Sequence, residues 1–172
     1  MQKQKSDARF MALALSLGRR GMGRVWPNPA VGCVIVRDGV IVGRGRTADG
    51  GRPHAETEAL CQAGDKARGA TAYVSLEPCS HHGKTPPCAN ALIDAGIAEV
   101  VVATGDPNPQ VSGAGIAMLE AAGIAVRMGI LKEQADADHA GFFLTQTRGR
   151  PYITLKLATT LDGHIATTTG DS

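Results

Sequence analysis

Segments typical of strands and of helices alternate along most of this sequence, and that order constrains the fold more than any other feature. Apolar runs at 30–36 and 40–45 flank Arg37-Asp38-Gly39, which predicts a β-hairpin with Asp-Gly at its turn. Helical and strand-like segments then follow one another to about residue 148. Such alternation is typical of a mostly parallel sheet with helices on both faces, so we expect an α/β fold.

The predicted elements follow from hydrophobic periodicity and from the residues that start and stop helices. A helix over about 6–19, capped by Ser6, precedes the hairpin. Beyond the hairpin, the sequence predicts helices at 53–63, 86–96, 115–123 and 131–148 and strands at 70–76, 98–104 and 125–130. Past Arg148-Gly149-Arg150-Pro151 the pattern predicts a strand, a turn and a polar end, too short to bury a core alone.

Composition bounds the cellular role of the chain. The net charge is +2 and no long block of Lys and Arg occurs, which argues against a nucleic-acid binder. No apolar run approaches the roughly 18 residues that a membrane span needs, and the polar N-terminus has no signal-peptide core. We therefore expect a cytoplasmic protein without nucleic-acid or membrane partners, in which cysteines are metal ligands or buried thiols rather than disulfides.

Two short motifs carry candidate metal chemistry. In mid-helix, His54 and Glu56 would point about 200° apart, so both serve one site only if it lies just beyond the N-terminus of their helix. Cys79 stands where a predicted strand ends, and Cys88 begins the next predicted helix after two prolines. Two helix N-termini and one strand end can therefore converge, at the place where parallel α/β sheets bind ligands.

The residue types at this point suit a catalytic zinc ion. His54, Cys79 and Cys88 offer three ligands, whereas a structural zinc site normally has four. An open position leaves room for a water molecule, whose pKa zinc lowers from 15.7 to about 7. Glu56 is not needed as a ligand and can shuttle protons. The set matches that of zinc nucleobase deaminases. Taken singly, the same residues could be a helix-start histidine, buried thiols and a first-turn acid.

Longer segments resemble the deaminase domain of the RibD family of bifunctional riboflavin-biosynthesis deaminase/reductases. They run in order through roughly residues 6–147 and read PNPAVGCVIV, GGRPHAETEAL, YVSLEPCSHHGKTPPC and GDPNPQVSGAG. PYITLKLATTLDGHIA resembles the first strand and turn of that family's reductase domain, which is dihydrofolate-reductase-like and binds NADPH. The resemblance implies a zinc-dependent cytidine-deaminase-like domain at 1–147, and a linker with the truncated start of a reductase domain at 148–172.

The resemblance also implies the fold, the cofactor and the substrate. The fold would be a three-layer α/β/α sandwich around a mixed, mostly parallel sheet, with Zn²⁺ held by His54, Cys79 and Cys88 and Glu56 as the proton shuttle. The substrate would be a pyrimidine ribonucleotide, 2,5-diamino-6-ribosylamino-4(3H)-pyrimidinone 5′-phosphate, which loses its 2-amino group as ammonia. NADPH would be needed only by a full-length protein with the reductase domain, and we expect a homo-oligomer.

By the family pattern, five residues contact the substrate: Asn28, His81, Lys84, Asp106 and Asn108. A lysine offers a point charge for the phosphate, whereas turn formation beside proline is the alternative role for Asn28 and Asn108. The chain departs from the family at Thr47, where many relatives have a histidine. Arg46 or Arg52 could compensate for that histidine.

Two other functions fit parts of the pattern. A zinc deaminase of a free nucleobase or of adenosine in transfer RNA would share the chemistry, but those relatives use Cys-x-x-Cys, and here eight residues separate Cys79 from Cys88. A protein whose zinc is structural would need a fourth ligand, for which His81 or His82 is the candidate.

Overall fold

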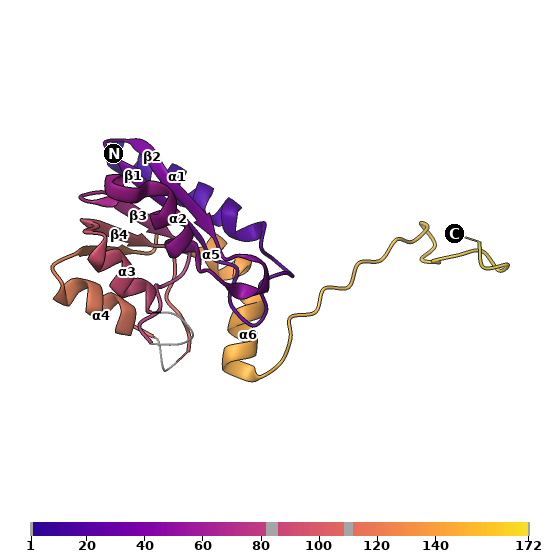
Figure 1. Cartoon of the computed structure of the whole chain (residues 1–172). Coiled ribbons are helices and arrows are strands. Elements are labelled where there is room, and N and C mark those ends of the chain that lie inside the picture. Colours follow the sequence, from indigo (N-terminus) through magenta and orange to yellow (C-terminus); the bar gives the residue numbers. More distant parts are fainter. Residues whose placement is uncertain (1, 82–85, 109–111, 172) are drawn as a thin grey trace.

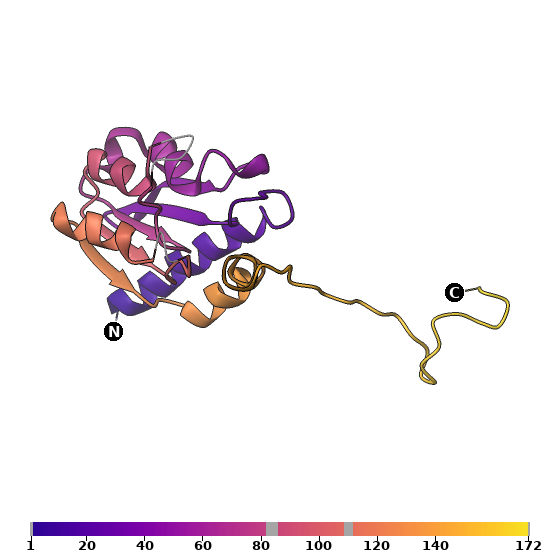
Figure 2. The ribbon, with the colours of Figure 1, turned by 90° about the horizontal axis from the view of Figure 1, so that it is seen from below.

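The computed structural model describes residues 2–81, 86–108 and 112–171, and its body is one sheet between two layers of helices (Figures 1 and 2). The strands are β1 (Gly32–Arg37), β2 (Val40–Arg46), β3 (Thr71–Val74), β4 (Glu99–Val102) and β5 (Ala125–Met128). The α-helices are α1 (Gln2–Arg19), α2 (Ala55–Ala63), α3 (Cys88–Asp94), α4 (Ala114–Ala121), α5 (Lys132–Asp138) and α6 (Ala140–Arg148). Two 3-10 turns, η1 (Asp49–Gly51) and η2 (Gly64–Ala67), flank α2.

The strands lie in the order β2-β1-β3-β4-β5. Strand β1 is antiparallel to both β2 and β3, whereas β3, β4 and β5 pair in parallel. Among the described strands, β1 is thus the one that runs opposite to the rest, and the predicted mixed, mostly parallel sheet is confirmed. The hairpin is confirmed too, because Asp38 (φ 51°) and Gly39 (φ 77°) both adopt the left-handed conformation that its tight turn requires.

Alternate residues of the strands point to opposite faces of the sheet, and each face is covered by its own helices. Cys33 and Ile35 of β1 pack in one apolar cluster with residues of α2, α3 and α4. Val34 and Val36 pack in a second cluster with residues of α1 and α5. Figure 2 shows the sheet between these two layers. The predicted three-layer α/β/α architecture is therefore confirmed.

Helix α2 lies unusually close to β2, and this contact fixes where the helix begins. A Cβ atom at Gly45 would lie 2.1 Å from the carbonyl oxygen of Ala55, the first residue of α2. Position 45 therefore admits only glycine while α2 stays in place. Arg46 at the end of β2 pairs with Gly32 at the start of β1, next to the end of β3. The N-terminus of α2 thus lies at the carboxyl edge of the parallel strands.

Two helix predictions were wrong in detail. Helix α1 begins at Gln2, so Ser6 lies inside the helix and does not cap it. The single helix predicted over 131–148 is interrupted at His139 (φ −94°, ψ 4°), which ends α5 and precedes α6. The interruption lets Ala135 of α5 pack in one apolar cluster while Phe142 of α6 packs against the other. Tertiary packing on two faces of the sheet thus overrides the continuous helical pattern.

Residues 151–160 form neither a helix nor a strand, so the strand predicted after residue 150 is not formed. The segment runs away from the body of the molecule (Figure 1), and Ile153 and Leu155 are 82% and 78% exposed. A strand needs a neighbouring strand to receive its backbone hydrogen bonds, and none lies beside this segment in the described structure. The assignment of 148–172 to the start of a reductase domain stays a prediction.

The helices of the described residues were compared with the length and apolar character that a bilayer requires. None of them is long and apolar enough to cross a membrane.

Candidate active site

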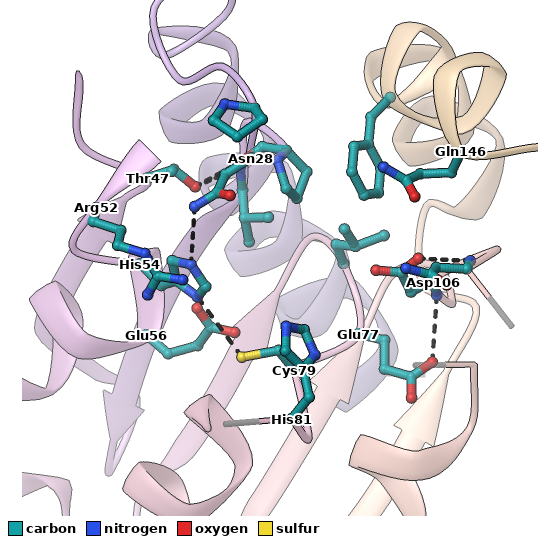
Figure 3. A pocket seen from close by; sticks show the side chains of 16 residues that line it. Asn28, Thr47, Arg52, His54, Glu56, Glu77, Cys79, His81, Asp106 and Gln146 are labelled. Atoms are coloured by element: carbon teal, nitrogen blue, oxygen red, sulfur yellow. Dashed lines mark hydrogen bonds between the residues drawn. The ribbon is translucent and has the colours of Figure 1, made fainter. Parts of the chain in front are cut away.

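A pocket of about 180 Å³ opens at the carboxyl edge of the parallel strands (Figure 3). Its walls come from the loop before β1, the end of β2, the start of α2, the segments after β3 and β4, and α6. The lining residues are Pro27, Asn28, Pro29, Val31, Thr47, Arg52, His54, Glu56, Leu76, Glu77, Cys79, His81, Asp106, Asn108, Phe142 and Gln146. The predicted convergence of helix starts and strand ends therefore produces a real cavity.

Three potential metal ligands meet at the floor of this pocket. The Nδ1 atom of His54 lies 3.2 Å from Sγ of Cys88 and 3.8 Å from Sγ of Cys79. The backbone N–H of Cys88 donates to Sγ of Cys79 (3.3 Å). His54 is the N-cap residue of α2, Cys88 is the first residue of α3, and Cys79 follows β3. The three ligand atoms all lie within 4.8 Å of one another.

The three side chains affect one another's ionisation. A hydrogen bond from Cys88 lowers the pKa of the Cys79 thiol to about 4, against the opposing effect of burial. The hydrogen bond with Cys79 raises the pKa of His54, and the partnership with Cys79 raises that of Cys88. Of the three side chains, Cys79 is thus the one whose surroundings favour the anionic form. One imidazole and two sulfurs form a donor set that zinc prefers.

Glu56 lies beside the trio and is the second residue of α2. Its side chain is 3% exposed and lines the pocket, and it faces the cavity next to His54 and Cys79 in Figure 3. Burial raises the pKa of its carboxyl group to about 7. A carboxyl group with a pKa near neutrality can both take up and release a proton during a reaction.

Asn28 contacts both His54 and the neighbouring loop that contains Gly51. Its Nδ2 atom donates to the carbonyl oxygen of Gly51 (2.6 Å) and lies 3.2 Å from Nε2 of His54 (Figure 3). Its backbone N–H closes a turn onto the carbonyl oxygen of Val25 (2.9 Å). Partners of this kind orient a ligating imidazole ring. Asn28 therefore orients His54 in addition to the substrate contact that the family pattern implies, which stays a prediction.

Three other predicted substrate residues line the pocket as well. His81 is exposed at its rim, and Asp106 and Asn108 line it. The Oδ1 atom of Asp106 accepts a hydrogen bond from the backbone N–H of Asn108 (2.8 Å), and burial raises the pKa of the Asp106 carboxyl group. Lys84 and His82 lie outside the described residues.

Sequence reasoning missed two lining residues, Phe142 and Gln146 of α6. In Figure 3, Gln146 points from α6 toward the cavity, across from Asn28 and Thr47. Their place in the pocket could not be recognised from the sequence, because the pattern predicted one unbroken helix over 131–148 and no motif includes either residue. The break at His139 redirects α6 over the pocket, and no local signal announces it.

Thr47 holds the loop that carries Asn28. Its hydroxyl group donates to the carbonyl oxygen of Pro29 (2.9 Å) and accepts from the backbone N–H of Val31 (3.0 Å). The hydroxyl group is thus engaged by the protein itself rather than directed at a ligand. Arg46 donates to the carbonyl oxygen of Thr47, whereas Arg52 lines the pocket. Of the two arginines that could replace the family histidine, the structure brings Arg52 to the site.

Comparison with known proteins assigns the chain to a family. The family described as "Cytidine and deoxycytidylate deaminase zinc-binding region" matches residues 4–104. The chain belongs to this deaminase family. The match extends from α1 through β4 and includes all three members of the trio and Glu56.

Within the deaminase family, the chain is similar to RibD proteins, so the resemblance in its sequence is confirmed. It is 54% identical over 166 residues to riboflavin biosynthesis protein RibD of Escherichia coli and 55% identical over 166 residues to that of Aquifex aeolicus. These alignments cover 96% of this chain but 45% and 47% of those proteins. The chain therefore spans about half the length of the curated relatives it matches.

Solved structures agree on the fold. RibD of Acinetobacter baumannii superposes with a TM-score of 0.90 at 49% identity, covering 98% of this chain and 48% of that chain. A second solved structure, from Thermotoga maritima, is a diaminohydroxyphosphoribosylaminopyrimidine deaminase/5-amino-6-(5-phosphoribosylamino)uracil reductase. It superposes with a TM-score of 0.92 at 46% identity, covering 99% of this chain and 49% of that chain. The predicted cytidine-deaminase-like fold is confirmed.

We expect Thr47→Val to lower the free energy of unfolding by about 1–2 kcal/mol, because the isosteric change removes one buried and one partly buried hydrogen bond to the loop before β1. Thr147→Val is the control, since the Thr147 hydroxyl group donates to a carbonyl oxygen on the exposed surface of α6. Urea unfolding of both variants measures the difference. Equal stability of the two variants would mean that Thr47 does not hold the loop.

Proposed function

We propose that this chain is a zinc-dependent hydrolase that deaminates 2,5-diamino-6-ribosylamino-4(3H)-pyrimidinone 5′-phosphate, a step of riboflavin biosynthesis. Membership of the zinc-binding deaminase family and high similarity to RibD proteins support the reaction class and the pathway. The observation that carries the proposal is the meeting of His54, Cys79 and Cys88 with the buried carboxyl group of Glu56 at one pocket.

The trio is the proposed zinc site. Among residues 2–81, 86–108 and 112–171, the potential ligands that cluster are three, His54, Cys79 and Cys88. A structural zinc site is normally closed by four protein ligands, whereas a catalytic site has three and an open position. His81, the described candidate for a fourth ligand, lies at the exposed rim and is not part of the cluster. The arrangement therefore supports catalytic rather than structural zinc. When bound, zinc would lower the pKa of a water molecule at the open position to about 7.

Glu56 is the proposed proton carrier. It would take a proton from the attacking water and give it to the ring nitrogen next to C2 as the carbon–oxygen bond forms. It would then carry the second proton of the water to the 2-amino group. The C–N bond breaks, ammonia leaves, and C2 becomes a carbonyl carbon. Both transfers need a buried group close to the reacting atoms, which the position of Glu56 at the start of α2 supplies.

Other polar residues of the pocket lining are the proposed substrate contacts. Asp106, Asn108 and His81 line the same pocket as His54 and Cys79, so they would hold the ring and ribose while the reacting carbon lies over the metal. We keep Asn28 and Lys84 in this group, Lys84 as the partner of the phosphate. Phe142 and Gln146 add an apolar and an amide contact from above.

Several features of a longer protein complete the proposal. Residues 148–172 would begin a reductase domain, and NADPH would serve that domain alone. We do not expect reductase activity from these residues by themselves. A homo-oligomer in the cytoplasm, with a small-molecule substrate and without nucleic-acid or membrane partners, also stays a prediction.

We expect the purified chain to carry about one zinc ion, because three ligands within bonding reach of one ion define a single site. Cys79→Ser should lose most of this zinc, since serine does not supply a soft anionic ligand. Cys61→Ser is the matched control, because Cys61 is an exposed free cysteine outside the cluster. Elemental analysis after dialysis measures the metal. Full zinc retention by Cys79→Ser would contradict the assignment of the site.

We expect the zinc-loaded chain to release ammonia from the diaminopyrimidinone ribotide and not from cytidine, guanine or a transfer-RNA anticodon stem-loop. Glu56→Gln should keep zinc and fold but slow turnover by at least about 100-fold, the usual effect of removing a general acid–base group. A coupled ammonia assay measures both. Preference for another compound in the panel would redirect the substrate assignment, and near-normal turnover by Glu56→Gln would mean that another group moves the protons.

A further inference from the structure

Glu77 is a buried acidic residue outside the metal cluster, and no part of the proposed reaction uses it. It lies two residues before Cys79 in the segment after β3, and its side chain is 5% exposed. Its backbone N–H donates to the carbonyl oxygen of Thr104 (3.0 Å), which continues the pairing of β3 with β4 beyond both strands. Glu77 therefore joins the ligand-bearing segment to the loop that follows β4.

The side chain of Glu77 accepts three backbone hydrogen bonds from that second segment. Its Oε2 atom accepts from the N–H groups of Asp106 (3.3 Å) and Gly113 (3.1 Å), and its Oε1 atom accepts from the N–H group of Gly115 (3.2 Å). Both oxygens are thus used, and the donors come from two places in the chain, the loop after β4 and the start of α4. In Figure 3 the bond between Glu77 and Asp106 closes the side of the pocket.

This arrangement supplies the missing cap of α4. Gly113, the N-cap residue of α4, has no side chain, so the first N–H groups of the helix need an acceptor from elsewhere. A carboxylate at this end is also favoured by the helix dipole. The helix start is further held by contact, because a Cβ atom at Gly115 would lie 1.9 Å from the carbonyl oxygen of Pro78, the residue before Cys79.

The same side chain sets the place of the proposed substrate residues. The N–H group of Asp106 is bound by Glu77, and the side chain of Asp106 in turn accepts from the N–H group of Asn108 (2.8 Å). One carboxylate thus fixes Asp106 and, through it, Asn108, at a set distance from Cys79. Because all three donors are N–H groups, an acceptor-only carboxylate suits the position better than an amide, which would oppose one of them with its own N–H.

We propose that Glu77 is a positioning residue for substrate binding, which holds the Asp106–Asn108 loop in register with the metal-binding segment. The inference rests on the proposed function for its kinetic consequence but not for its structural one. Glu77 touches no reacting atom in this account, so its loss disturbs the wall that binds the substrate while the metal cluster and Glu56 remain in place.

The test compares Glu77→Gln with the zinc-loaded wild-type chain. We expect full zinc content, a kcat within about threefold of wild type, and a KM raised about tenfold, the size expected when one charge-assisted hydrogen bond is lost. Asp7→Asn is the matched control, since Asp7 is also a buried carboxylate, 1% exposed. Asp7 belongs to α1 on the other face of the sheet, where it accepts hydrogen bonds from Tyr73 and Arg127. This variant should lose stability without a change in KM.

A double-mutant cycle separates positioning from a general structural role. If Glu77 acts through Asp106, then Glu77→Gln should raise KM by less than about twofold in an Asp106→Ala background, because the two changes remove one shared effect. An unchanged KM in Glu77→Gln, an equal rise in Asp7→Asn, or full additivity with Asp106→Ala would each overturn the proposal. Glu77→Asp, whose shorter carboxylate cannot reach all three donors, replaces Glu77→Gln if that variant is insoluble.

Amide hydrogen exchange distinguishes failure of this inference from failure of the proposed function. Should the wild-type chain deaminate no compound, the proposed function falls, and the exchange of the Asp106, Gly113 and Gly115 amides decides the inference. We expect at least one of these amides to exchange at least about tenfold faster in Glu77→Gln and none in Asp7→Asn, since the side-chain N–H of glutamine opposes one of the three donors. Unchanged protection at all three amides would overturn the anchoring role.

Discussion

The contact of the His54 imidazole with the thiols of Cys79 and Cys88 joins the three elements on which the site depends. Each residue stands at the end of an element: before α2, after β3 and at the start of α3. Helix N-termini bring partial positive charge to this point, which favours a thiolate there. The position of α2 in turn depends on Gly45, where any side chain would displace the helix.

The remaining walls of the pocket depend on contacts that are distant in sequence. Thr47 fixes the loop before β1, Glu77 fixes the loop after β4, and α6 covers the opening with Phe142 and Gln146. The candidate metal site is thus built from the ends of helices and strands, whereas single polar side chains hold the remaining walls through hydrogen bonds to the backbone.

The sequence predicted what is encoded locally. The hairpin follows from Asp38-Gly39, and the convergence of His54 and Cys88 follows from prolines and helix starts at known spacings. The break at His139 and the roles of Phe142 and Thr47 could not be predicted, because they depend on which face of the sheet each segment finally packs against. The missing strand beyond residue 150 has the same cause, since a strand forms only where a partner is present.

In the proposed site, three protein ligands leave one position of a zinc ion open beside Glu56. A crystal structure of the zinc-loaded chain, with diffraction recorded at the zinc absorption edge, would show whether this position is open. We expect one anomalous peak bonded to His54 at about 2.0–2.1 Å and to the sulfurs of Cys79 and Cys88 at about 2.3 Å, with a water molecule as fourth ligand facing Glu56. A fourth protein side chain on the metal, or a peak at another place in the chain, would contradict it.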